Sequence, residues 1–259
     1  MYRQSVPASD GSFIDMGAIS ESPTATITTT DTGFKLTFQD RVVTFNTPYT
    51  PDVRSYTGCS RCIGSGLSRD SIVLKLSGTE SDLSNTSYGN WQTQEGPVME
   101  GPKGVFAIGT LTTVGDRPLS GTAHYAGKAS GYATTPGLQR YTLDGNIALT
   151  ADFAANAITG GVSNVVAQRF YPSGNYDPIG RAGIANNITL HGTIAGVGFS
   201  GNARTVDVVP GTGDINVNLS GLSGSFGGAF HGPGASEVGG SLALSGAVST
   251  VIMSFGAKK

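Results

Sequence analysis

The stretch GSFGGAFHGPGASEVGGSLALSGAVSTVIMSFGAKK, residues 224–259, decides the fold of this chain. Along it, glycines and other small residues alternate with apolar ones, which is the pattern of strands with one buried face. Gly232 and Pro233 form a turn inside the stretch, and the chain ends on a strand followed by two lysines. We interpret the stretch as the closing strands of a small β-barrel.

The composition extends this interpretation to the rest of the chain. Glycine, with 39 of 259 residues, is about twice as frequent as the usual ~7 %, and charged residues, at 13 %, are about half as frequent as the usual ~25 %. Helix surfaces are normally filled by Glu, Lys, Arg, Gln and Ala, and here Lys and Arg together number only 16. We therefore predict an all-β protein, long enough to bury a sizeable core.

The charge and hydropathy patterns exclude some partners. The formal net charge is −2 with a pI near 5.9, and no run is rich in Lys or Arg, so we expect no nucleic acid partner. No window reaches the ~18 consecutive apolar residues of a membrane-spanning helix. The strand-like runs are too short and too rich in small residues for a membrane β-barrel, so we expect a protein that does not span the membrane.

The spacing of turn residues predicts two units. Up to about residue 100 the chain holds the short strand-like runs TATITTT, FKLTF, RVVTF and SIVLKLSG. The segment EGPVMEGPK, residues 95–103, contains two Gly-Pro pairs, and we do not expect regular strand pairing across it. We predict a β-rich N-terminal domain over residues 1–100 and a barrel domain over residues 101–259.

Eight strand-like runs follow this boundary, some of them hairpins. They are residues 105–110, 121–133, 145–153, 157–164, 186–195, 198–208, 214–230 and 239–255. Closing such a set into an eight-stranded antiparallel barrel removes exposed sheet edges and leaves an interior just wide enough for side chains or one small ligand. The inward positions read as Phe, Ile, Leu and Val packing. A β-solenoid would need a fixed repeat period, and we find none.

Several motifs resemble the barrel domain of the transferrin-binding-protein-B-like surface proteins of Gram-negative bacteria. They are Gly232, Pro233, Glu237, Gly239 and Gly240 near the end, with YGNW (residues 88–91), GVFAIGTLTT (104–113), GTAHYAGKASGYA (121–133) and ADFAANAITGGV (151–162) before them. The resemblance covers about the C-terminal two thirds of the chain. It implies an eight-stranded barrel beside a handle-like N-terminal domain, and the capture of a host or environmental ligand.

The resemblance also implies export. The first residues, MYRQSVPASDG, show no signal peptide, so we expect that an export signal was removed. Many members of the resembled family carry a lipid on a cysteine after the signal, whereas this chain has no cysteine before Cys59. We expect a protein of the outer-membrane surface that has lost its lipid anchor, or a freely secreted one.

The two cysteines, Cys59 and Cys62, lie in the motif GCSRCIG. A Cys-x-x-Cys pair can be a redox centre, half a zinc site or a disulfide. Redox thiols need a following helix and zinc needs four ligands, and neither is evident in this Pro- and Gly-rich loop. Because the resemblance implies export to an oxidising compartment, we predict a disulfide between Cys59 and Cys62 that stiffens the loop.

Three histidines are candidate haem ligands: His124, His191 and His231. Each is out of phase with its apolar neighbours, so we expect all three to point outward from the barrel and to be exposed. The resembled family commonly has threonine at the position of His124 and tyrosine at that of His231. The alternative for each is an exposed histidine without a ligand.

Two tyrosines are further candidates for haem iron. The segment RFYPSGNYDPIGR places Tyr171 and Tyr176 between Arg169 and Arg181. Phenolate oxygen binds ferric iron, and arginine can pair with the propionates of haem. The alternative is an ordinary polar loop between two barrel strands.

No motif indicates catalysis. We find no G-x-S-x-G, H-E-x-x-H or G-x-x-x-x-G-K-[ST] sequence, and Glu237, at the end of a turn, is better placed to accept backbone N–H bonds. By resemblance, we expect a ligand-binding protein for haem or iron acquisition that delivers its ligand to an outer-membrane receptor. The alternative is a host-protein-binding surface module or adhesin without a small ligand.

Overall fold

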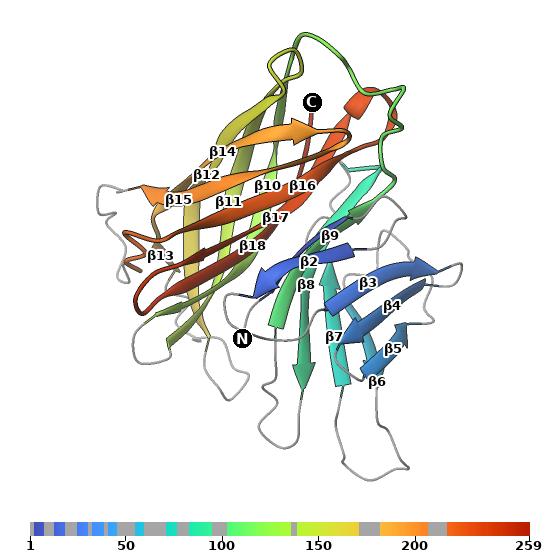
Figure 1. Ribbon diagram of the computed structural model, residues 1–259. Coiled ribbons are helices and arrows are strands. Elements are labelled where there is room, and N and C mark those ends of the chain that lie inside the picture. Colours follow the sequence, from blue (N-terminus) through green and yellow to red (C-terminus); the bar gives the residue numbers. More distant parts are fainter. Residues whose placement is uncertain are drawn as a thin grey trace.

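The computed structural model is built almost entirely of β-strands (Figure 1). It describes residues 3–7, 13–18, 25–30, 33–38, 41–45, 55–59, 71–76, 83–94, 103–135, 139–170, 182–206 and 217–259. The strands before the barrel are β1 (Arg3–Pro7), β2 (Phe13–Ala18), β3 (Ala25–Thr30), β4 (Gly33–Phe38), β5 (Arg41–Phe45), β6 (Ser55–Cys59), β7 (Ser71–Leu76), β8 (Thr86–Gln94) and β9 (Lys103–Gly109).

The later strands form a closed antiparallel barrel of eight strands, as predicted. They are β10 (Thr122–Thr135), β11 (Gln139–Asp152), β12 (Ala157–Phe170), β14 (Asn187–Ala195), β15 (Gly198–Val206), β16 (Ser223–His231), β17 (Glu237–Ser245) and β18 (Thr250–Lys258). The order β11-β10-β18-β17-β16-β15-β14-β12 closes through the pairing of β11 with β12. The short strand β13 (Ala182–Ile184) adds to β12, and the 3₁₀ turn η3 (Pro233–Ala235) connects β16 to β17.

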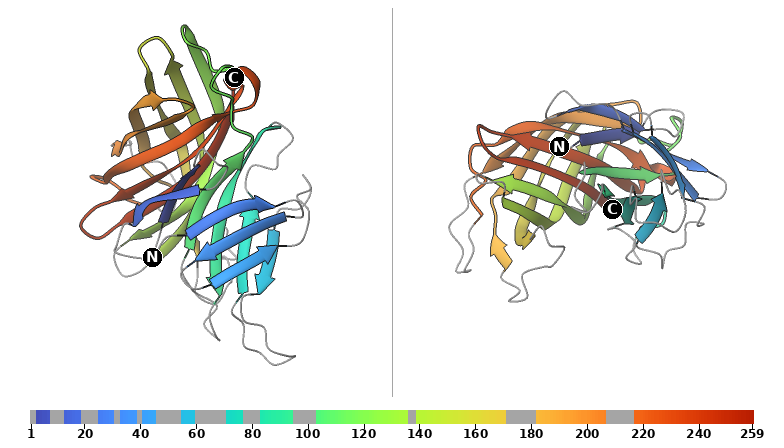
Figure 2. Two further views of the ribbon diagram at one scale, coloured as in Figure 1. Left: turned by 45° about the vertical axis from the view of Figure 1, so that its right-hand side comes forward. Right: turned by 90° about the horizontal axis from the view of Figure 1, so that it is seen from below.

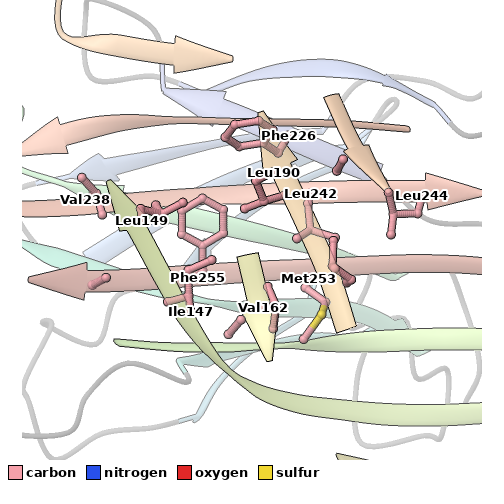
Figure 3. Packing of buried hydrophobic residues seen from close by; sticks show 14 of the residues in the cluster. Ile147, Leu149, Val162, Leu190, Phe226, Val238, Leu242, Leu244, Met253 and Phe255 are labelled. Atoms are coloured by element: carbon pink, nitrogen blue, oxygen red, sulfur yellow. The ribbon is translucent and has the colours of Figure 1, made fainter. Parts of the chain in front are cut away.

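Apolar side chains fill the inside of the barrel, in agreement with the predicted inward positions. Phe226, Leu242 and Phe255 come from three neighbouring strands and point to a common interior (Figure 3). At one end, the ring of Phe230 lies 5.4 Å from the rings of both Phe153 and Phe199, measured between centroids. Each such aromatic pair stabilises the core by about 0.5–1.5 kcal/mol beyond its burial. The interior is therefore occupied by the protein's own side chains.

The strands before the barrel form separate small sheets. β1 pairs with β2, β3, β4 and β5 form a three-stranded sheet, and β6, β7, β8 and β9 form a four-stranded sheet. The predicted runs FKLTF, RVVTF and TATITTT correspond to β4, β5 and β3. The sheet of β6 to β9 contacts the barrel more extensively than the other two sheets do, and we refer to it below as the first sheet.

Strand pairing differs from the predicted domain boundary. β8 and β9 pair antiparallel, from Thr86 opposite Gly109 to Gln92 opposite Lys103, so the boundary between residues 100 and 101 falls inside the first sheet. A Gly-Pro-rich stretch ends a strand, but the strands on its two sides can still pair as a hairpin. The predicted run 105–110 is therefore β9 and not a barrel strand, and the run 239–255 contains two strands, β17 and β18.

The first sheet lies against the outer face of β17 and β18, and β1 lies against β9, β16 and β17 (Figure 2). Residues of β17 and β18 that point away from the barrel interior are nevertheless buried, among them Ala243, Ile252 and Ser254. Val105 of β9 packs with Ala243 and Ile252. We call this contact the joint between the first sheet and the barrel.

Candidate functional site

A carboxylate at the joint ties the two parts together. Glu237 begins β17 and is 5 % exposed. Its two carboxylate oxygens accept hydrogen bonds from the backbone N–H groups of Ser84 and Asn85, at 2.7 and 2.9 Å, and the Asn85 side-chain amide donates a third at 3.4 Å. The prediction that Glu237 accepts backbone N–H bonds is confirmed, and its role is structural.

The chain that leads out of the first sheet is bonded to the end of the β16–β17 hairpin. Thr110 N–H donates to Asn85 O at 2.9 Å, and Gly232 N–H donates to Thr110 O at 2.9 Å. The Thr112 hydroxyl donates to Gly232 O at 2.7 Å. Near the middle of the joint, the Ser254 hydroxyl donates to Gly89 O at 2.8 Å. These bonds satisfy backbone groups that would otherwise be buried without partners.

Of the three predicted histidines, His231 is the one that the structure places differently. Its side chain points away from the barrel interior, as its phase predicts, but it is 0 % exposed because β1 and the segment that follows β9 lie against this face of β16. The expectation of an exposed residue is therefore wrong. The cause lies outside the local pattern, since a strand's alternation shows which face a residue occupies and not what covers that face. Buried in this way, His231 offers no nitrogen to a ligand outside the joint.

His124 and His191 are exposed on the outer face of the barrel, as predicted. Successive pairings place them in one row across four strands, in the order His124, Thr150, Thr159 and His191. The ring nitrogen Nδ1 of His124 lies 3.1 Å from the hydroxyl oxygen of Thr150. The row is a polar stripe around the barrel.

The two exposed histidines lie on strands that are well separated on the barrel surface. Neighbouring strands are about 4.8 Å apart, so three strand spacings separate His124 from His191 by about 14 Å along the surface. Two histidines on one ion bring their nitrogens within about 4 Å, because each metal–nitrogen bond is about 2 Å long. Among the described residues, no group of three or more His, Cys, Asp or Glu side chains could hold a metal ion.

The described outer surface also contains an open cleft of about 400 Å³ beside the joint. Its lining comes from β10, β11, β12 and β8 and comprises Tyr88, Lys128, Ala129, Ser130, Asp144, Gly145, Asn146, Asn164 and Val166. A β-bulge shapes it, since Asp144 pairs with Val166 whereas Asn146 pairs with Ser163, so that β12 has one extra residue. Asn164 takes a left-handed conformation in the bulge, with φ of 52°, which asparagine tolerates better than most residues.

The cleft presents both signs of charge. The Lys128 ammonium donates to the side-chain oxygen of Asn146 at 2.7 Å, and an ammonium carries three N–H donors. Partial burial raises the pKa of Asp144, and the charge of Lys128 opposes this shift. The sequence alone does not predict the pair of Lys128 and Asn146, because only the register of β10 on β11 brings these two residues side by side. The arrangement suits the recognition of a polar, charged surface.

Two predicted sites cannot be placed. Tyr171, Tyr176 and Cys62 lie outside the described residues, and Cys59 ends β6. The disulfide between Cys59 and Cys62 and the two tyrosine ligands therefore stay predictions. In the part of the chain that is described, no helix is long and apolar enough to cross a membrane.

The fold and its surface define a class: a closed antiparallel β-barrel, filled inside, with a smaller sheet bonded to its outer face. The chain belongs to the family of the C-lobe and N-lobe β-barrels of transferrin-binding protein B, which it matches over residues 117–259. The resemblance expected from the sequence is thus confirmed. Among curated proteins, none matches this chain.

Solved structures of such proteins share the fold. A double mutant of the vaccine antigen transferrin binding protein B from Haemophilus parasuis is 16 % identical, with a TM-score of 0.56 over 99 % of this chain and 44 % of its own. Isotype 1 transferrin binding protein B from serogroup B Neisseria meningitidis is 15 % identical, with a TM-score of 0.50 over 96 % of this chain and 64 % of its own. This chain therefore spans less than two thirds of these relatives.

Proposed function

We propose that the protein is a non-catalytic binding protein of iron acquisition, which recognises a host iron-carrying protein with the outer surface of its barrel. The observation that supports this most directly is the filled interior. Side chains such as Phe226 and Phe255 occupy the space that a small ligand would need, so a ligand is met outside. The family is described by transferrin binding, and the relatives named above are transferrin binding proteins.

The cleft beside the joint is the part of the described surface best suited to anchor such a partner. Its charged groups, Lys128 and Asp144, can pair with opposite charges of a protein and fix its orientation. Iron is then not bound by this chain but remains in the partner.

The proposal also includes where the protein acts in the cell and to which partner it delivers its iron source. Because the resemblance described above implies a role at the bacterial cell surface, we propose that the protein is held on the outer membrane by a lipid anchor or is secreted. It hands its iron source to an outer-membrane receptor. This role requires no catalytic group, and it makes the receptor the second partner of the chain.

To test the proposal, this protein is immobilised and its binding of transferrin, lactoferrin and haemoglobin is measured, each with and without iron. We expect one iron-loaded carrier to bind. The double variant Lys128→Ala, Asp144→Asn should weaken binding by about 10-fold, which corresponds to roughly 1.4 kcal/mol. The double variant Arg204→Ala, Asp116→Asn makes the same charge changes at exposed positions away from the cleft and should bind normally. Failure to bind any iron-carrying protein would contradict the proposal.

Haem is the second candidate ligand, favoured by the exposure of His124 and His191 on the outer face. In this second proposal one histidine binds the haem iron alone or with Tyr171 or Tyr176. A haem titration in the same series decides between the candidates. A Soret shift that one of the variants His124→Ala and His191→Ala abolishes would favour haem over a carrier protein.

A further inference from the structure

The imidazole of His231 occupies a narrow space inside the joint. The residue His231 is the last of β16 and lies opposite Glu237 of β17. Its backbone forms an isolated β-bridge with Leu111, in the segment that follows β9. A Cβ atom placed on Gly109 would come within 2.7 Å of its Nδ1 atom, and one on Gly239 within 3.3 Å of its Nε2 atom. One of these glycines belongs to the first sheet and the other to the barrel, so the ring is wedged between the two parts.

Neither ring nitrogen of His231 has a hydrogen-bond partner within the described part of the chain. A neutral imidazole carries one donor and one acceptor, whereas the protonated ring carries two donors and a charge. A buried polar group without a partner is costly, and a buried charge costs much more. The closed joint therefore tolerates the neutral ring and disfavours the protonated one.

The groups that face the ring do little to offset this cost. From β17 it faces Glu237, whose two oxygens already accept bonds from Ser84 and Asn85. Lys258 of β18 lies on the far side of Glu237 in the sheet and adds a positive charge. From the first sheet and the segment after it, the ring meets Gly109, Leu111 and the backbone of Thr110, whose carbonyl oxygen already accepts a hydrogen bond from Gly232. The strand β1, which contacts β9, β16 and β17, carries one charged residue, Arg3.

We propose that His231 makes the joint sensitive to protons: when the ring is protonated, the first sheet loosens from the outer face of β17 and β18. The closed state binds the proton poorly and the open state, in which water reaches the ring, binds it normally. Acidification thus shifts the population toward the open state by linkage. The device would couple the pH of the surroundings to the relative position of the two parts of the molecule.

The direction and the pH window follow from the burial. Burial lowers the pKa of His231 from its ordinary value of 6.5 to about 4, while the backbone of Thr110 and the charge of Glu237 act in the opposite direction. Above pH 6.5 both states hold a neutral ring and the joint has its full stability. As the pH falls from 6.5 toward 4, only the open state takes up a proton, and the closed state loses up to about tenfold in relative population per pH unit.

Hydrogen exchange of the backbone at pH 7 and pH 5, corrected for the intrinsic exchange rate, tests this inference. In the wild-type protein, we expect amides of β8, β9 and residues 110–112 to exchange about tenfold or more faster at pH 5, while the amides of β11 and β12 keep their protection. The variant His231→Gln cannot titrate and should show no such pH dependence. The matched variant His124→Gln removes an exposed histidine and should behave as the wild type.

A second measurement keeps the test decisive if His231→Gln does not fold. The ring protons of His231 in the wild-type protein can be followed by NMR from pH 8 to pH 4, and they should titrate well below 6.5. The inference is overturned if His231 titrates at 6.5 or above, if exchange in β8 and β9 is the same at both pH values, or if His231→Gln retains the wild-type pH dependence.

Discussion

Single residues at the joint show what a local pattern can and cannot predict. The position of Glu237 at the end of a turn was enough to predict that its carboxylate accepts backbone N–H bonds. The donors, Ser84 and Asn85, are more than 150 residues away in sequence, and only the fold identifies them. His231 is the converse case: its phase was predicted correctly, but its burial depends on a sheet formed by a distant part of the chain.

Replacing Glu237 by glutamine tests how much its carboxylate contributes. Hydrogen bonds to a charged group stabilise by about 1.5–3 kcal/mol, and an amide would turn one N–H group toward the N–H donors of Ser84 or Asn85. We expect Glu237→Gln to lower the free energy of unfolding by roughly 2 kcal/mol in urea titrations. Asp116→Asn, at an exposed turn position, serves as the control and should change stability little. Equal stability of the two variants would mean that the carboxylate is not a structural anchor.

At the scale of elements, most strands were predictable because they are short, alternate and end in turn residues. The runs that became β3, β4, β5, β10 and β14 were found with errors of a few residues at their ends. The prediction merges β17 and β18, because Ala247 and Val248 continue the apolar pattern through the turn between them. The bulge that shapes the cleft was not predictable, since it depends on the register of β11 on β12.

Glycines inside the barrel strands let neighbouring strands coil closely, and one substitution tests this. A Cβ atom on Gly131 of β10 would overlap with the carbonyl oxygen of Ile252 in β18, so the strands would have to move apart. We expect Gly131→Ala to destabilise the protein by about 3 kcal/mol, at the upper end for an overpacked core. Gly115→Ala has open space around its Cβ atom and should be close to neutral. Thermal unfolding of both variants makes the comparison, and similar melting temperatures would argue against a close-packed barrel here.

At the scale of the whole molecule, the first sheet and the barrel do not divide at the predicted domain boundary, and the joint connects them. The Gly-Pro-rich segment predicts a boundary, whereas β8 and β9 pair on its two sides and together contact the outer face of β17 and β18. The apolar contact of Val105 with Ala243 and Ile252, and the bonds of Glu237 and Ser254, are formed only when both parts are folded. Each part is therefore stabilised by the other.

This mutual support predicts that the first sheet and the barrel unfold together at neutral pH. Trp91, the single tryptophan, lies in β8 and reports on the first sheet, whereas far-UV circular dichroism is dominated by the longer barrel strands. We expect the two signals to give coincident urea transitions, because a cooperative unit has no populated state in which one part alone is folded. Glu237→Gln should shift both transitions by the same amount, since it weakens the contact on which both parts depend. A fluorescence transition at clearly lower urea than the circular dichroism transition would show instead that the first sheet detaches on its own, and that the joint contributes less than the interior of the barrel.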